Sequence, residues 1–84
     1  MSVLENKIDE ILRPLLKDEG VDLVSLRFFI ENDQTFLEIG VRMFEGTTDL
    51  KAVEVISRFI SGWLDKYDFI ESAYILDVFA VSAK

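Results

Sequence analysis

Residues 46–78 read GTTDLKAVEVISRFISGWLDKYDFIESAYILDV and contain a turn, a helix, an acidic stretch and a strand, in that order. Thr48 or Asp49 can cap the helix, because side-chain oxygens of these residues accept hydrogen bonds from first-turn N–H groups. Apolar residues then recur at intervals of three and four, which predicts one buried helical stripe. We expect that stripe to consist of Val53, Ile56, Ile60 and Leu64, with Phe59 and Trp63 at its borders. An acidic loop over residues 65–72 leads to an apolar strand over residues 74–81.

A second amphipathic helix is predicted at the start of the chain. Ser2 and Glu5 have the spacing of a capping box, and Gly20 is a typical helix stop. Pro14 removes one backbone donor, so we expect a bend there. The apolar stripe of this helix comprises Leu4, Ile8, Ile11, Leu12, Leu15 and Leu16.

Between the helices, two strands and a polar turn predict a β-hairpin. The strands span residues 21–31 and 36–43, and Asn32, Asp33 and Gln34 form the turn. Strict alternation places Val24, Leu26, Phe28 and Ile30 on one face of the first strand and Leu23, Ser25, Arg27, Phe29 and Glu31 on the other.

The element order helix–strand–strand–helix–strand predicts an α+β fold with residues 1–84 as a single small domain. A three-stranded sheet needs a cover, so both helices are expected on its purely apolar face. The strand order stays open. That covered face includes Leu26, Phe28, Leu37, Ile39, Leu76 and Val78.

The opposite face of the sheet combines large apolar and charged side chains and is the candidate partner-binding surface. Its predicted residues are Leu23, Arg27, Phe29, Phe36, Arg42, Ile75, Phe79 and Val81. Two alternatives stay open: long Arg and Glu side chains lie across the apolar groups, or the strand register slips by one residue.

Charge and composition narrow the classes of partner. Sixteen acidic residues against nine basic ones give a net charge of −7, so direct nucleic-acid binding is not expected and a basic protein is the better partner. No apolar run approaches the ~20 residues that cross a membrane, and the N-terminus lacks the pattern of a secretory signal. The absence of cysteine fits a cytoplasmic protein.

Catalytic and metal-binding patterns are missing from the sequence. Without histidine and cysteine, the chain lacks the usual general base, the nucleophilic thiol and most zinc ligands. Its serines have no evident base partner, and its acidic residues lack the spacing of a calcium loop. We therefore expect no catalytic residue, no metal site, no cofactor and no enzymatic activity.

Several short sequence motifs occur, over nearly the whole chain, in an order and spacing that resemble those of the N-terminal domain of the RimP family of ribosome maturation factors. The matching pieces are Ile56-Ser57-Arg58, Trp63-Leu64-Asp65, Tyr74-Ile75-Leu76-Asp77-Val78, Pro14-Leu15-Leu16, Gly20-Val21-Asp22-Leu23-Val24 and Leu37-Glu38-Ile39-Gly40-Val41. After Asp77-Val78 the family continues Ser-Ser-Pro-Gly into a second, barrel-like domain, whereas this chain has Phe79-Ala80-Val81-Ser82 and ends at Lys84.

The resemblance implies a non-enzymatic role in ribosome biogenesis: assisting assembly of the small ribosomal subunit in the bacterial cytoplasm, through contact with a basic ribosomal protein. A second domain packing on the open sheet face is a further expected contact. The alternative is a stand-alone structural module that has lost the ribosomal role and self-associates as a homodimer through the same face. An RNA-binding KH-like domain ranks third, because the Gly-x-x-Gly clamp is missing and the net charge is negative.

Overall fold

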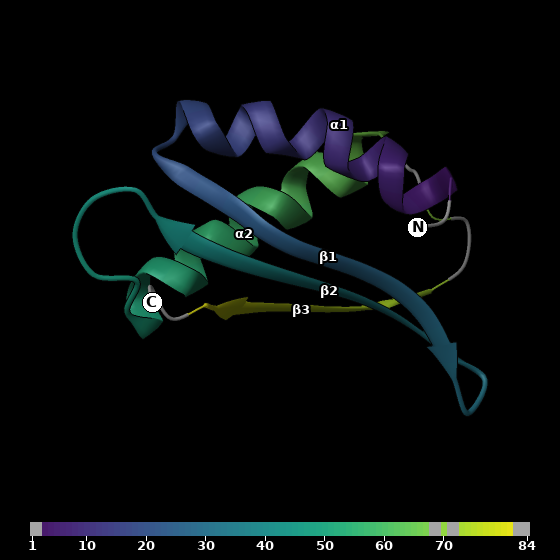
Figure 1. Cartoon of the computed structure of the whole chain (residues 1–84). Helices are drawn as coiled ribbons and strands as arrows, with labels where there is room; N and C mark the ends of the chain where they lie inside the picture. Colours follow the sequence, from purple (N-terminus) through teal and green to yellow (C-terminus); the bar gives the residue numbers. More distant parts are fainter. Residues whose placement is uncertain (1–2, 68–69, 71–72, 82–84) are drawn as a thin grey trace.

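The computed structural model describes residues 3–67, 70 and 73–81. The elements follow the order α1 (Val3–Asp18), β1 (Val21–Glu31), β2 (Gln34–Met43), α2 (Leu50–Tyr67) and β3 (Ile75–Ala80). The three strands form one sheet in the order β1-β2-β3, with β1 antiparallel and β3 parallel to the central β2 (Figure 1). The predicted α+β architecture is confirmed, and the sheet is mixed.

Helix α1 follows the predicted stripe: Ile8, Leu12 and Leu16 are fully buried. The helix continues through Pro14 and ends at Asp18, and Gly20 adopts a φ of +79°, a conformation that glycine tolerates best. The predicted capping box depends on Ser2, which lies outside the described residues.

The hairpin turn is tighter than predicted. Only Asn32 (φ 51°) and Asp33 (φ 65°) form it, and Gln34 already belongs to β2. Positive φ at both central residues is typical of a two-residue turn that matches the twist of the strands. This end of the hairpin projects beyond the helices, so Ile30, predicted on the covered face, remains 69% exposed (Figure 1).

Strand β1 contains a register shift, so the side chains before the shift lie on the opposite sheet faces from those predicted. Leu23 pairs with Val41, but the next pair is Ser25 with Gly40, which leaves Val24 as an extra residue. Such a bulge switches the side-chain alternation. Leu23, predicted on the open face, is therefore buried at 1% exposure, whereas Val24, predicted on the covered face, is exposed. The prediction was wrong for both residues.

Helix α2 begins with the expected cap and ends later than predicted. The Ala52 N–H donates to Asp49 Oδ1 at 2.9 Å, so Asp49 is the cap, while Thr48 Oγ1 accepts from the Met43 N–H at 2.9 Å. The helix extends to Tyr67, three residues into the predicted acidic loop, and the Tyr67 ring stacks on Trp63 with centroids 5.3 Å apart. Ile56, Ile60 and Leu64 form its buried face.

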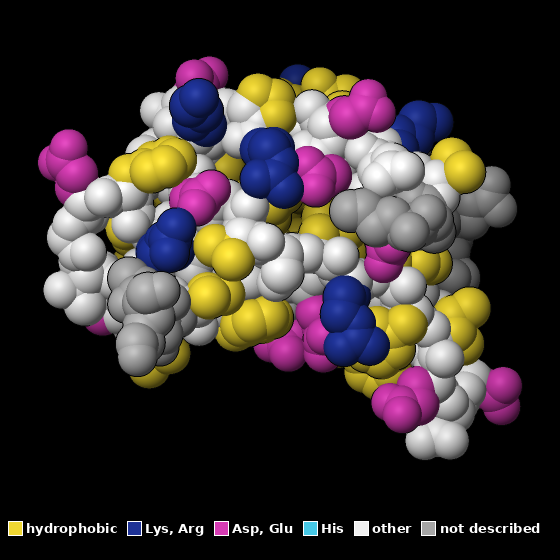
Figure 2. Space-filling view, in the orientation of Figure 1, with side chains coloured by type: hydrophobic (Ala, Val, Ile, Leu, Met, Phe, Trp, Pro, Cys, Tyr) yellow, Lys and Arg dark blue, Asp and Glu magenta, His cyan; other side chains and the backbone are white. Residues whose placement is uncertain are grey.

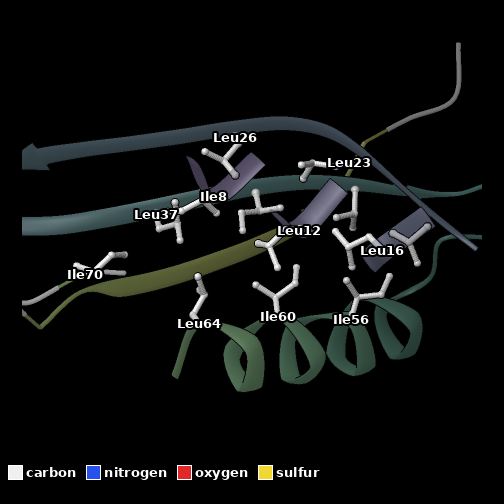
Figure 3. Close-up of a cluster of buried hydrophobic side chains, with 13 residues drawn as sticks. Ile8, Leu12, Leu16, Leu23, Leu26, Leu37, Ile56, Ile60, Leu64 and Ile70 are labelled. Atoms are coloured by element: carbon white, nitrogen blue, oxygen red, sulfur yellow. The ribbon is translucent and has the colours of Figure 1, made fainter. Parts of the chain in front are cut away.

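The hydrophobic core lies between the sheet and the two helices, which cover the same sheet face, as predicted. α1 packs on β1 and α2 packs on β3. Figure 3 shows the buried side chains of both helices pointing toward those of the strands. The buried set comprises Ile8, Leu12, Leu16, Val21, Leu23, Leu26, Leu37, Ile39, Val41, Ile56, Ile60, Leu64 and Ile70.

Tyr74 packs against this core and makes the stability of the fold depend on pH in the alkaline range. Burial raises the pKa of Tyr74 above its ordinary value, and the negative charge of Asp65 raises it further. The fold thus favours the neutral phenol, a contribution that is complete below the ordinary tyrosine pKa of about 10 and is lost as pH rises through the higher folded pKa. In urea unfolding between pH 8 and pH 11, Tyr74→Phe should lose less stability than the wild type. Parallel pH profiles of the two proteins would contradict this assignment.

Candidate protein-interaction surface

The sheet face that the helices leave uncovered, called here the open sheet face, is organised in rows across the strands. Register pairs place three rows on it, each running from β1 through β2 to β3. The rows are Phe29–Phe36–Ile75, Arg27–Glu38–Asp77 and Ser25–Gly40–Phe79, and the pair Asp22–Arg42 extends the face beyond the bulge. In the space-filling view, hydrophobic side chains lie among basic and acidic ones over the strand layer (Figure 2).

The aromatic row is tightly packed. The rings of Phe29 and Phe36 stack with centroids 5.2 Å apart and an interplanar angle of 18°. The Arg27 guanidinium lies over Phe29, 4.6 Å from its ring centroid. Ile75 and Phe79 on β3 remain 44% and 39% exposed. Arginine and aromatic side chains of this kind are enriched at the centre of protein interfaces, where a partner buries them.

Two cross-strand ion pairs border the apolar groups. Arg27 lies 3.5 Å from Glu38, and Arg42 lies 3.1 Å from Asp22. Both pairs are partly exposed, where an ion pair contributes about 0–1 kcal/mol, so they orient the side chains more than they stabilise the fold. No basic side chain of the described residues forms an ion pair with Asp77, so β3 carries an unmatched negative charge.

Gly40 brings β3 side chains close to the sheet backbone. A Cβ at this position would lie 2.5 Å from Ser25 Oγ, 2.8 Å from Val81 Cγ2 and 3.1 Å from Phe79 Cε2. The Phe79 ring and the Val81 side chain therefore occupy the space above the glycine. A glycine inside a strand often marks such a close approach, and this was the signal in the sequence that could have located the contact.

The structure brings seven of the eight predicted surface residues together on or beside this face. Arg27, Phe29, Phe36, Arg42, Ile75 and Phe79 belong to its rows, and Val81 lies next to Gly40 after the end of β3. Leu23 is the exception, because the bulge at Val24 turns it into the core. The ion pair from Asp22 to Arg42 was missed, since Asp22 lies before that bulge.

Within residues 3–67, 70 and 73–81, no group of three or more acidic side chains is arranged to hold a metal ion. No helix in this part of the chain is long and apolar enough to span a membrane.

A family model matches most of the chain. The model of the RimP N-terminal domain matches residues 11–80, which is more than half of the chain and includes the whole sheet. RimP proteins are ribosome maturation factors and generally not enzymes, so the general role of the chain is in ribosome maturation. Because the match covers most of the chain, the chain belongs to the RimP family and corresponds to the N-terminal domain of that family.

Proposed function

We propose that this domain assists assembly of the small ribosomal subunit in the bacterial cytoplasm, by binding a basic ribosomal protein with its open sheet face. The observation that carries the proposal is the composition of that face. The stacked Phe29 and Phe36 rings and the exposed Ile75 and Phe79 supply apolar contact area, in a chain of net charge −7. Such a surface attracts a cationic protein at long range and gives it an apolar centre to bury.

The negative charge also argues for a protein rather than bare RNA as the partner. Nucleic-acid affinity arises largely from basic groups that displace counterions from phosphates. On the open sheet face, Arg27 and Arg42 are each paired with a carboxylate, and Asp77 adds a charge of the opposite sign. Direct binding to RNA is therefore not part of the proposal.

Co-sedimentation with purified small ribosomal subunits at moderate salt tests the proposal. The wild-type chain should sediment with the subunits, and Phe29→Ser and Phe79→Ser should each reduce the bound fraction severalfold. Val55→Ser is the matched control, because Val55 is 59% exposed on α2, away from the open sheet face. Binding should weaken as salt rises, since an exposed electrostatic contact is screened.

The controls separate loss of contact from loss of fold. Circular dichroism melts should show all variants folded, although Phe29→Ser loses a stacked pair worth about 0.5–1.5 kcal/mol. Naked small-subunit RNA should not bind the wild type. Equal sedimentation of the wild type and both phenylalanine variants would contradict the proposed surface. Concentration-dependent dimerisation, abolished by the same variants, would favour the self-associating module instead.

A further inference from the structure

The two edges of the sheet differ in how their backbone groups are satisfied. On the outer edge of β1, side chains of α1 cover the strand: Arg13 Nη1 donates to the Leu23 carbonyl at 2.8 Å, and the Phe28 N–H donates to Glu5 Oε2 at 2.6 Å. Asp9 holds Arg13 in place at 2.7 Å, and this hydrogen bond raises the pKa of Arg13 above its ordinary value. Covering an edge in this way prevents another strand from pairing with it.

The outer edge of β3 has no such cover among the described residues. The Val81 N–H donates to the Val41 carbonyl at 2.9 Å, so odd-numbered residues of this segment direct their backbone groups toward β2. Backbone groups alternate along a strand, and those of Leu76, Val78 and Ala80 therefore point outward. In the part of the chain that the structure describes, no helix or strand lies beyond β3 (Figure 1).

A groove accompanies this free edge. It has a volume of about 430 Å³ and runs between β3 and α2. Its walls are formed by Leu50, Val53, Glu54, Ser57 and Arg58 of α2 and by Leu76, Asp77 and Val78 of β3. A free strand edge beside a helix is the arrangement in which an extended peptide adds to a sheet, with main-chain hydrogen bonds for affinity and alternate side chains for specificity.

The charge row on the open sheet face specifies what the added strand should carry. In the row Arg27–Glu38–Asp77, Arg27 and Glu38 pair at 3.5 Å, whereas Asp77 stands beside another carboxylate at the free edge. A basic side chain on the far side of Asp77 would match its charge. The adjacent rows end in Ile75 and Phe79, so apolar residues fit two positions before and two positions after the basic one.

We propose that the outer edge of β3 binds an extended peptide segment as a fourth strand, with the pattern apolar-x-basic-x-apolar and the basic residue beside Asp77. A second copy of this chain fits less well, because pairing two β3 edges around Asp77 would bring like charges together. The site is the strand edge, not the open sheet face, so the inference goes beyond the proposed function. It holds whether or not the domain contacts a ribosomal subunit.

Two labelled peptides, acetyl-Thr-Val-Thr-Lys-Thr-Val-Thr-amide and the same peptide with Glu in place of Lys, test the pairing by fluorescence anisotropy. The Lys peptide should bind the wild-type chain about fivefold more tightly, as expected for one exposed pair replaced by a like-charge contact. Asp77→Lys should reverse the preference. Glu10→Lys changes the net charge equally on the exposed side of α1 and should leave the preference as in the wild type.

Backbone readouts distinguish strand addition from charge attraction alone. On binding, the amides of Leu76, Val78 and Ala80 should shift in NMR spectra and exchange more slowly with solvent. Ala80→Pro removes one outward donor at an exposed edge position, which a strand tolerates, and should abolish binding of both peptides. Equal affinity of the two peptides, no binding at millimolar peptide, or unchanged β3 amides would overturn the proposal. Dimerisation through β3 in the absence of peptide would also overturn it, and no ribosomal component enters any of these measurements.

Discussion

Leu12→Ala should lower the free energy of unfolding by about 2–5 kcal/mol, the cost of removing a buried leucine side chain and leaving a cavity. Leu12 is 0% exposed and lies at the middle of the buried face of α1, among side chains of both helices and the sheet (Figure 3). A domain of this length has a total stability of about 4–12 kcal/mol, so one substitution would remove a large part of it. Urea unfolding followed by the fluorescence of Trp63, the single tryptophan, measures the change.

The matched control is Leu50→Ala, the same substitution at a position that is 83% exposed at the start of α2. Its effect should stay within about 0.5 kcal/mol, as for most surface changes. A cost below about 1 kcal/mol for Leu12→Ala would contradict the packing of α1 into a common core, because full burial without a cavity penalty is not observed in well-packed interiors.

The helices could be predicted from the sequence because their burial is periodic. Intervals of three and four placed Ile8, Leu12 and Leu16 on one face of α1, and the structure buries all three. The end of α2 was placed too early because Asp65 and Lys66 suggest a solvated loop. In the structure Tyr67 stacks on Trp63 one turn earlier, and Lys66 lies over the Trp63 ring at 4.7 Å, which extends the helix.

The error in β1 arose because two apolar residues follow each other at the bulge. Leu23 and Val24 are both hydrophobic, so alternation alone is compatible with either one facing the core. The choice is made by pairing with β2, where Val41 meets Leu23 and Gly40 meets Ser25. Such a register depends on contacts distant in sequence, and a reading of local pattern does not contain them.

The position of β3 at a free edge of the sheet could not be predicted from the sequence pattern either. Its apolar residues indicate a strand, but not a parallel partner. Parallel pairing follows from α2, which returns the chain to the end of the sheet from which β2 starts. This arrangement puts Asp77 beside Glu38 and leaves both the exposed Phe79 and the outer backbone groups of β3 accessible, so both proposed contacts depend on the same crossover.

Gly40→Ala should lower the free energy of unfolding by about 1–2 kcal/mol, although alanine is normally favoured over glycine inside a strand. The new Cβ would lie 2.5 Å from Ser25 Oγ and 2.8 Å from Val81 Cγ2, distances at which side chains have to move. Gly62→Ala is the matched control, because Gly62 lies inside α2 and an added Cβ would meet no atom within 4 Å apart from its chain neighbours and the nearby backbone of the helix. It should raise stability by about 0.5–1 kcal/mol, so the same substitution has opposite signs at the two glycines.

A double-mutant cycle locates the source of the cost. Ser25→Ala removes the closest contacting atom, so Gly40→Ala should be less destabilising in that background by a coupling of about 0.5–1 kcal/mol. The remaining cost reflects Phe79, whose Cε2 lies 3.1 Å from the position of the added Cβ, and Val81. If Gly40→Ala proves neutral or stabilising, these side chains move aside freely, and the close packing of Phe79 against the sheet is not what orders the open sheet face. If it destabilises as expected, the glycine is what allows Phe79 and Val81 to pack closely against β2. The row Arg27–Glu38–Asp77 separates this contact from the stacked rings of Phe29 and Phe36.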